Sequence, residues 1–279
     1  MLILERPWTR QPQTASIDLS NPLATGLVFD FDVVSARNRL GKFATNYGST
    51  ISASSVGLAR SFTRASSQYV DCGDLESWDV GGSNFTFQFL FRMRSAASSA
   101  TRFQLLSKDS ATGRQLWVEL NTKADSSSDN SFTVVWLNGT LNQSRTPANS
   151  LNVGTWHNCF GQRLGNSVNY WIDGIAQSVT QIAANWVDVA STTTPLLLGA
   201  RSYAANNDYF NGDISIARFW NRALRSDEVS ALSANPWQLF QPRRIHIPTA
   251  AAAASAPTIT ALSAIGITAT SAQPRISYS

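Results

Sequence analysis

The sequence predicts an all-β protein, an antiparallel sandwich or barrel, from three observations. Short runs of β-branched and aromatic residues recur along the chain, each bounded by Gly, Asn, Asp or Ser. Two connections, Asp173-Gly174 and Asn138-Gly139, carry dipeptides that favour a two-residue hairpin turn. Only one segment, residues 225–235, has a convincing helical pattern.

The strand-like runs follow one another from residue 26 onward. They lie at residues 26–34, 59–73, 84–95, 102–109, 114–121, 132–139, 156–164, 168–177, 195–202 and 212–224. The clearest is NFTFQFLFRM, where the two-residue period of a strand places Phe85, Phe87, Phe89 and Phe91 on one face. We expect that face to be part of the core.

The helical segment RSDEVSALSAN carries start and stop signals. Ser226 is the expected N-cap, and the carboxylates of Asp227 and Glu228 favour the positive N-terminal end. Pro236 lies just beyond the expected end. The strand before it and this helix are expected to close the domain.

Composition divides the chain into four parts. They are an extended arm at 1–25, a main domain at 26–248, an Ala-rich connector at 249–257 and a short strand-forming tail at 258–279. Trp237, Leu239 and Phe240 are too apolar to remain in solvent and should dock on the domain. The tail is too small to bury a core alone, so we expect it to pair with neighbouring chains in a homo-oligomer, for example a trimer.

Charge and hydropathy exclude several classes of protein. Lys and Arg number 22 against 18 Asp and Glu, but no basic stripe with interleaved aromatics indicates nucleic-acid binding. No apolar run approaches the roughly 20 residues that span a bilayer. The apolar stretch at the N-terminus is interrupted at Glu5 and Pro7, which makes it too short for the apolar region of a signal peptide. Cys72 and Cys159 are expected to be buried thiols, with a disulfide as the alternative.

The order of these motifs resembles the laminin-G-like, concanavalin-A-like jelly-roll family. The resemblance covers residues 26–232 and rests on the segments ARSFTRASSQYVDCGDL, NFTFQFLFRM, QLLSKD, VGTWHNCFGQR, VNYWIDGIAQ and LLLGARSYAANNDYFNGDISIARFWNRALRSDEVSAL. It implies an antiparallel two-sheet jelly-roll sandwich with one short C-terminal helix. It also implies that the strand at 213–220 runs beside the first strand and closes the sandwich.

The flanking segments resemble a narrower group. RPWTRQPQ before NPLATGLVFDF, and NPWQLFQPRRIHIP after the helix, are similar to the ends of proteins from tailed bacteriophages and prophages. This resemblance implies a virion protein that is made in the host cytoplasm without a signal peptide. Its partners would be other virion proteins of the capsid or tail.

Catalytic chemistry finds little support. Retaining glycosidases need two carboxylates about 5–5.5 Å apart, and Asp30 and Asp32 share a strand face, but the resemblance assigns no catalysis to the first strand. His157 corresponds to a strand position that packs beside Trp156. With no zinc cluster, nucleophile elbow or phosphate loop, we predict no catalytic residues and no enzymatic activity.

Aromatic residues on faces away from the core are the candidate contact residues. Alternation places Trp117 and Glu119 off the core face of one strand, and Asn169 and Trp171 off the core face of another. Tryptophans in such positions can stack on sugars or form a protein interface. We expect a ligand or an interface at these four residues.

Calcium is the one cofactor to consider, because many relatives in the resembled family bind it through loop oxygens. The candidate ligands are Asn207, Asp208 and Asp213. The favoured interpretation is that Asn211-Gly212 forms a turn that Asp213 caps. We therefore expect no cofactor, with calcium as the alternative.

These observations favour a non-enzymatic virion structural or decoration protein that uses its sandwich as an interaction module. The alternative is a carbohydrate-binding adhesin for host-surface glycans. A glycoside hydrolase is the least supported function.

Overall fold

The computed structural model describes residues 11–12, 16–41, 44–96, 102–109, 116–120, 130–138, 140–181, 193–201 and 208–240. The chain divides into two units, 1–242 and 243–279, and every described residue lies in the first. The predicted connector (249–257) and tail (258–279) lie outside the described residues, as does most of the predicted arm.

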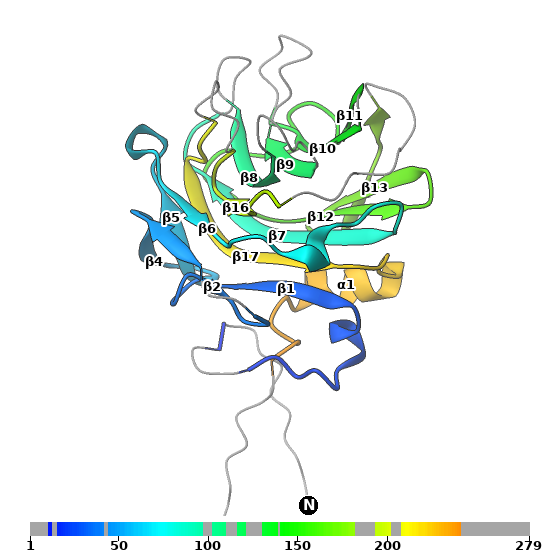
Figure 1. The fold of residues 1–279 in the computed structure, drawn as a ribbon, viewed down its shortest axis with the longest axis horizontal. Coiled ribbons are helices and arrows are strands. Elements are labelled where there is room, and N and C mark those ends of the chain that lie inside the picture. Colours follow the sequence, from blue (N-terminus) through cyan, green and yellow to red (C-terminus); the bar gives the residue numbers. More distant parts are fainter. Residues whose placement is uncertain are drawn as a thin grey trace, which may run out of the picture. The chain divides into compact units, whose positions relative to one another are not determined.

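Two antiparallel sheets pack face to face, which confirms the predicted sandwich (Figure 1). The nine-stranded sheet has the order β14 (Ile175–Gln177), β13 (Ser167–Ile172), β12 (Trp156–Leu164), β7 (Phe85–Met93), β17 (Gly212–Trp220), β1 (Leu27–Asp32) and β2 (Arg37–Asn38), with β5 (Gly57–Phe62) on β17 and β4 (Thr50–Ser54) on β5. The eight-stranded sheet has the order β15 (Thr180–Gln181), β11 (Thr140–Arg145), β10 (Phe132–Asn138), β9 (Leu116–Leu120), β8 (Phe103–Lys108), β16 (Leu197–Leu198), β6 (Tyr69–Asp71) and β3 (Thr45–Tyr47).

The main core lies between the sheets and contains the predicted phenylalanine face. Phe85, Phe87, Phe89 and Phe91 of β7 are all fully buried in it. The Phe87 ring lies 5.1 Å from that of Phe219 on the neighbouring strand β17. Alternation along β7 therefore decides which side chains fill the sandwich.

Strand β17 lies beside the first strand, β1, as expected, and joins it to the rest of the nine-stranded sheet. It pairs with β7 on one side and with β1 on the other. Gly212 is its first residue and does not form the predicted turn. A Cβ at Gly212 would lie 2.1 Å from the carbonyl oxygen of Arg92. The glycine is required for close packing of β17 on β7.

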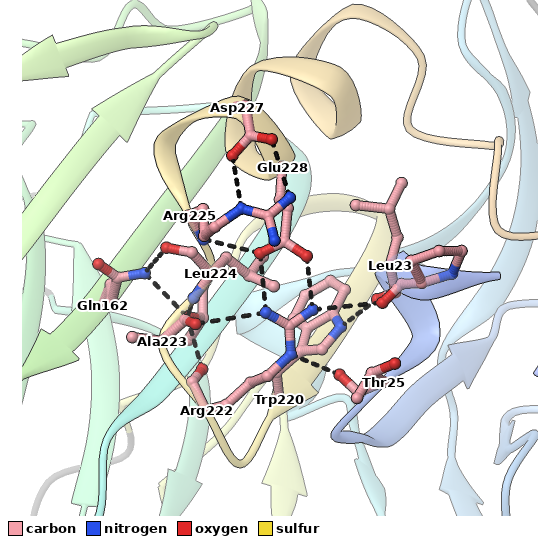
Figure 2. Close-up of polar contacts among 12 residues, drawn as sticks. Leu23, Thr25, Gln162, Trp220, Arg222, Ala223, Leu224, Arg225, Asp227 and Glu228 are labelled. Atoms are coloured by element: carbon pink, nitrogen blue, oxygen red, sulfur yellow. Dashed lines mark hydrogen bonds and ion pairs between the residues drawn. The ribbon is translucent and has the colours of Figure 1, made fainter.

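Helix α1 (Ser226–Ala234) follows β17 after a short bend. Ser226 is the first helical residue and the cap is Arg225, one residue earlier than predicted. Figure 2 shows Glu228 accepting hydrogen bonds from the Arg225 backbone (2.7 Å) and from both terminal nitrogens of Arg222 (2.8 Å each). Arg222 Nε donates to the Thr25 carbonyl at 2.6 Å. This network attaches the helix to the segment that leads into β1.

Three 3-10 turns complete the helical structure: η1 (Pro22–Ala24), η2 (Arg64–Ser66) and η3 (Glu76–Trp78). Among the described residues, no helix is long and apolar enough to cross a membrane.

A second apolar cluster lies on the outer face of the nine-stranded sheet. Leu90, Ile216 and Trp220 of the sheet pack there against α1 and the segment that follows it. Trp237, Leu239 and Phe240 are buried in this cluster, as predicted. Ile17 of the predicted arm forms a bridge with Phe240. The two ends of the described chain therefore lie together on this face.

The hairpin between β13 and β14 has the predicted geometry, with positive φ at Asp173 (52°) and Gly174 (82°). Asp173 also accepts from the His157 ring, and His157 accepts from the Asn152 backbone at 2.9 Å, so this histidine has a structural role as expected. Gly139 of the other predicted turn lies outside the described residues. Both cysteines are buried and unpaired.

Candidate functional site

The four predicted contact residues lie on opposite sides of the sandwich. Trp117 and Glu119 belong to β9 of the eight-stranded sheet, and Asn169 and Trp171 belong to β13 of the nine-stranded sheet. In both strands the other side chains fill the main core, so the predicted faces are confirmed. The structure therefore forms no single site from these four residues.

Trp117 and Glu119 are each only 1% exposed. Glu119 accepts hydrogen bonds from Gln104 (2.7 Å) and from the Trp117 indole (3.0 Å). Burial raises the pKa of the Glu119 carboxyl, although Arg102 and Arg201 oppose this rise. The Arg201 guanidinium lies over the Trp117 ring, 4.2 Å from its centre. Neighbouring side chains therefore cover Trp117 and Glu119 on this outer face. A contact role for these two residues stays a prediction.

Trp171 and Asn169 are partly buried. Trp171 packs against the second apolar cluster, which also contains residues of α1. Its ring is therefore committed largely to packing. A contact role for this pair stays a prediction.

Of the predicted calcium ligands, Asp213 is engaged by arginines. Arg92 Nη2 lies 2.7 Å from one carboxylate oxygen, and Arg94 pairs with the other. Asp208 lies 3.9 Å from Arg201, and Asn207 is outside the described residues. Within the described ranges, no group of three His, Cys, Asp or Glu side chains is placed to hold a metal ion.

Asp30 and Asp32 share a strand face, as the strand period requires, but both form ion pairs with arginines. Asp30 is buried and pairs with Arg39 and with Arg218, whose Nε lies 2.6 Å away. Asp32 pairs with Arg39 at 3.2 Å. These contacts give both carboxylates a structural role on the outer face of β1.

A row of three tyrosines forms the best candidate contact surface. Tyr47 of β3 and Tyr69 of β6 are paired residues, and their rings stack with centres 4.4 Å apart and planes at 12°. The Tyr209 ring lies 6.3 Å from that of Tyr69. Val70 points into the core, so Tyr69 faces outward. Tyr47 is 45% exposed and the other two are partly exposed. We call these residues the tyrosine row.

An open pocket of about 430 Å³ adjoins the tyrosine row. It is formed where the turn η2, the end of β7 and the start of β17 meet. Its walls include Thr63, Arg64, Ser95, Phe103, Tyr209 and Asn211. Tyr209 therefore belongs both to the row and to the pocket. An apolar ring beside convergent polar groups is the usual composition of a small-ligand site.

The one charged side chain among the described lining residues of this pocket is positive, that of Arg64. None of these described residues is acidic. Arg92 and Arg94, close in sequence to Ser95, share the single carboxylate of Asp213, which leaves this group with one excess positive charge.

The hydroxyl of Tyr69 stays protonated near neutral pH. Burial raises its pKa, and Tyr47, Tyr209 and Asp71 raise it further. A hydrogen bond with the Tyr47 side chain also contributes to this rise.

Sequence inspection missed the tyrosine row because its members come from three separate segments. Residues 45–47 were not assigned to a strand, and Tyr209 lies in a connection. The one local signal was Tyr69, which alternates with the buried Val70 in the motif QYVDCG. Only the pairing of β3 with β6 brings the first two rings together.

A sequence model of the concanavalin A-like lectin/glucanases superfamily matches residues 64–230, more than half of the chain. No curated protein matches this sequence. Solved structures are similar in fold at low identity.

The binding domain of Paraclostridial Mosquitocidal Protein 1 is 14% identical, with a TM-score of 0.56 over 76% of this chain and 52% of that one. Domain 4 of AbnA, a GH43 extracellular arabinanase from Geobacillus stearothermophilus solved with arabinotriose, is 13% identical, with a TM-score of 0.54 over 74% of this chain and 98% of that one. Botulinum neurotoxin type C, which depends on two ganglioside molecules to enter cells, is 9% identical, with a TM-score of 0.54 over 78% of this chain and 52% of that one. This chain thus spans about half the length of the two toxin chains.

Proposed function

The chain belongs to the concanavalin A-like lectin/glucanases superfamily, and we propose that it is a non-catalytic module that binds glycans at the tyrosine row. The observation that carries the proposal is the stacked, partly exposed set Tyr47, Tyr69 and Tyr209 beside an open polar pocket. Aromatic rings offer an apolar face to a sugar ring and a hydroxyl to its polar substituents. Proteins of similar fold that bind an arabinotriose or depend on gangliosides support the proposal.

A non-catalytic role is supported by the state of Asp30 and Asp32, the pair of acidic residues that the sequence places on one strand face. Asp30 and Asp32 are held in ion pairs with arginines, and a retaining mechanism needs two free carboxylates at a fixed separation. Hydrolysis of any bound polysaccharide by the purified chain would contradict this part of the proposal.

We also propose that binding needs no calcium. Both oxygens of Asp213 already have arginine partners, so a cation there would have to displace positive side chains. Adding EDTA should leave glycan binding unchanged, whereas loss of binding restored by calcium would contradict this part.

The test is a glycan array with the full chain, followed by titration of the best ligand. Tyr47→Ala and Tyr209→Ala should each weaken binding by about three- to ten-fold, the effect expected for one aromatic contact. Trp171→Ala serves as the control on the opposite sheet and should bind as the wild type does. If Trp171→Ala loses affinity while both tyrosine variants keep it, the ligand binds at the other sheet and the proposed site is wrong.

The second candidate function, a virion structural or decoration role, places the same module on a bacteriophage particle. The resemblance of the flanking segments to virion proteins favours it, and β4 offers an edge for assembly. Strand β4 pairs only with β5 in the described part of the chain, and Ile51 on it is 47% exposed. Such edges accept strands from neighbouring chains, which would suit a homo-oligomer. Detection of the protein in many copies on purified particles would support this role, and its absence from them would contradict it.

A further inference from the structure

We propose that the glycan bound at the tyrosine row is acidic, and that Arg64 receives its anionic substituent, a carboxylate or a sulfate. This inference rests on the proposed function and adds the ligand's charge and the residue that recognises it.

Arg64 is the one arginine among the described residues whose side chain has no hydrogen bond or ion pair. It lines the pocket, and its buried Nε has no partner. The nearby arginines differ. Arg92 and Arg94 have side chains that are 35% exposed, and both pair with Asp213. Leaving a buried donor unsatisfied costs stability, so an arginine retained only for structure would be expected to have its donors paired.

The surroundings of Arg64 favour an anion over a cation or a neutral group. The described residues that line the pocket include no carboxylate, and the Arg92–Arg94–Asp213 group carries a further excess positive charge. Asp71, the acidic residue beside Tyr69, accepts from the Gly73 backbone at 2.8 Å and forms no ion pair with Arg64. An incoming anion would therefore meet a positive field without displacing a resident acid.

The geometry also suits a saccharide better than a simple ion. Tyr209 and Arg64 line the same pocket, so a sugar ring on Tyr209 can bring an acidic substituent to the guanidinium. The side-chain amide nitrogen of Asn211 donates to Ser95 Oγ at 2.9 Å, and its side-chain amide oxygen can accept from a sugar hydroxyl. The planar fork of arginine matches a carboxylate or sulfate through two parallel hydrogen bonds.

The experiment measures affinity of the full chain for matched pairs of ligands that differ in charge. The pairs are oligogalacturonate and its methyl ester, sialyllactose and lactose, and dextran sulfate and dextran. The wild type should bind at least one acidic member about ten-fold or more tightly than its neutral partner, as charge-assisted contacts predict. Rising salt should weaken that preference. The pairs that respond distinguish a carboxylate from a sulfate.

Arg64→Gln should remove the preference for the acidic member and leave binding to the neutral member unchanged. Arg64→Lys should retain part of the preference, because it keeps the charge without the fork. Arg225→Gln is the matched control: it makes the same change in net charge at an exposed arginine, the N-cap of α1, and should behave as the wild type. Thermal unfolding of each variant confirms that it is folded.

The outcomes separate this inference from the proposed function. If acidic and neutral members bind equally, or if Arg64→Gln keeps the preference, the role of Arg64 is overturned while glycan binding at the tyrosine row stands. If Arg225→Gln loses the preference as Arg64→Gln does, only net charge matters and the role of Arg64 is again overturned. If no saccharide binds and Tyr209→Ala has no effect, the proposed function itself fails.

Discussion

Phe87 shows how much of the fold depends on single side chains. Its ring is fully buried, and its centre lies 5.3 Å from the ring centre of Trp78, 4.9 Å from that of Phe85 and 5.1 Å from that of Phe219. Because these rings come from β7, β17 and the turn η3, removing one of them leaves a cavity that the rigid sheets cannot close.

We predict that Phe87→Ala and Phe89→Ala each lower the free energy of unfolding by about 3–5 kcal/mol, the usual cost of a buried phenylalanine. Denaturant unfolding of the purified variants measures it. Ile175→Ala is the control, since Ile175 is 68% exposed and should change stability by less than about 0.5 kcal/mol. Unfolding curves identical to wild type for both phenylalanine variants would show that this face is not the core.

At the scale of one element, α1 depends on Glu228. This carboxylate accepts from Arg222 and caps the helix at the Arg225 backbone. The hydrogen bonds from Arg222 lower its pKa below the ordinary value of 4.5, although partial burial opposes the change. A carboxyl whose pKa is lower in the folded state stabilises that state above the unfolded pKa, and the contribution is lost as pH falls through the folded pKa.

Glu228→Gln should therefore lower the free energy of unfolding at pH 7 by about 1–3 kcal/mol, the range for hydrogen bonds to charged groups. The difference from wild type should remain constant above pH 4.5 and shrink as the pH falls below it. Denaturant titrations over this range measure the difference. Asp227→Asn, which breaks the exposed pair with Arg225, should have a smaller effect. A difference between wild type and Glu228→Gln that grows in acid would contradict the assignment.

At the scale of the whole molecule, the first unit should fold without the last residues of the chain. Trp237, Leu239 and Phe240 are already buried in the second apolar cluster, so the apolar surface around α1 is covered before residue 241. The second apolar cluster, as formed by the described residues, includes no residue beyond Phe240.

Deleting residues 249–279 should leave a folded sandwich with an unchanged thermal midpoint. If the tail mediates assembly, the truncated protein should lose self-association in sedimentation experiments, or lose attachment to particles. Unchanged assembly and attachment would show that the tail acts only as a linker. A truncated protein that fails to fold would instead show that the tail contributes to the sandwich.

The sequence by itself determined the fold class, the main core face and the closing strand. The all-β class and the core face follow from local periodicity: alternation in NFTFQFLFRM places four phenylalanines on one side whatever the rest of the chain does. The two-sheet jelly roll and the position of the closing strand beside the first strand came from the family resemblance of the motifs. The turn at Asp173-Gly174 is equally local, because positive φ favours those residue types.

The tertiary structure alone decided which aromatic residues are accessible. Trp117 and Trp171 lie on the faces that alternation predicted, yet Arg201 covers one and the packing around α1 partly buries the other. Tyr47, Tyr69 and Tyr209 are distant in sequence and meet only because β3 pairs with β6 and β17 begins nearby. Strand period tells which way a side chain points. What covers it, and which distant residue lies beside it, depends on how the sheets pair and pack.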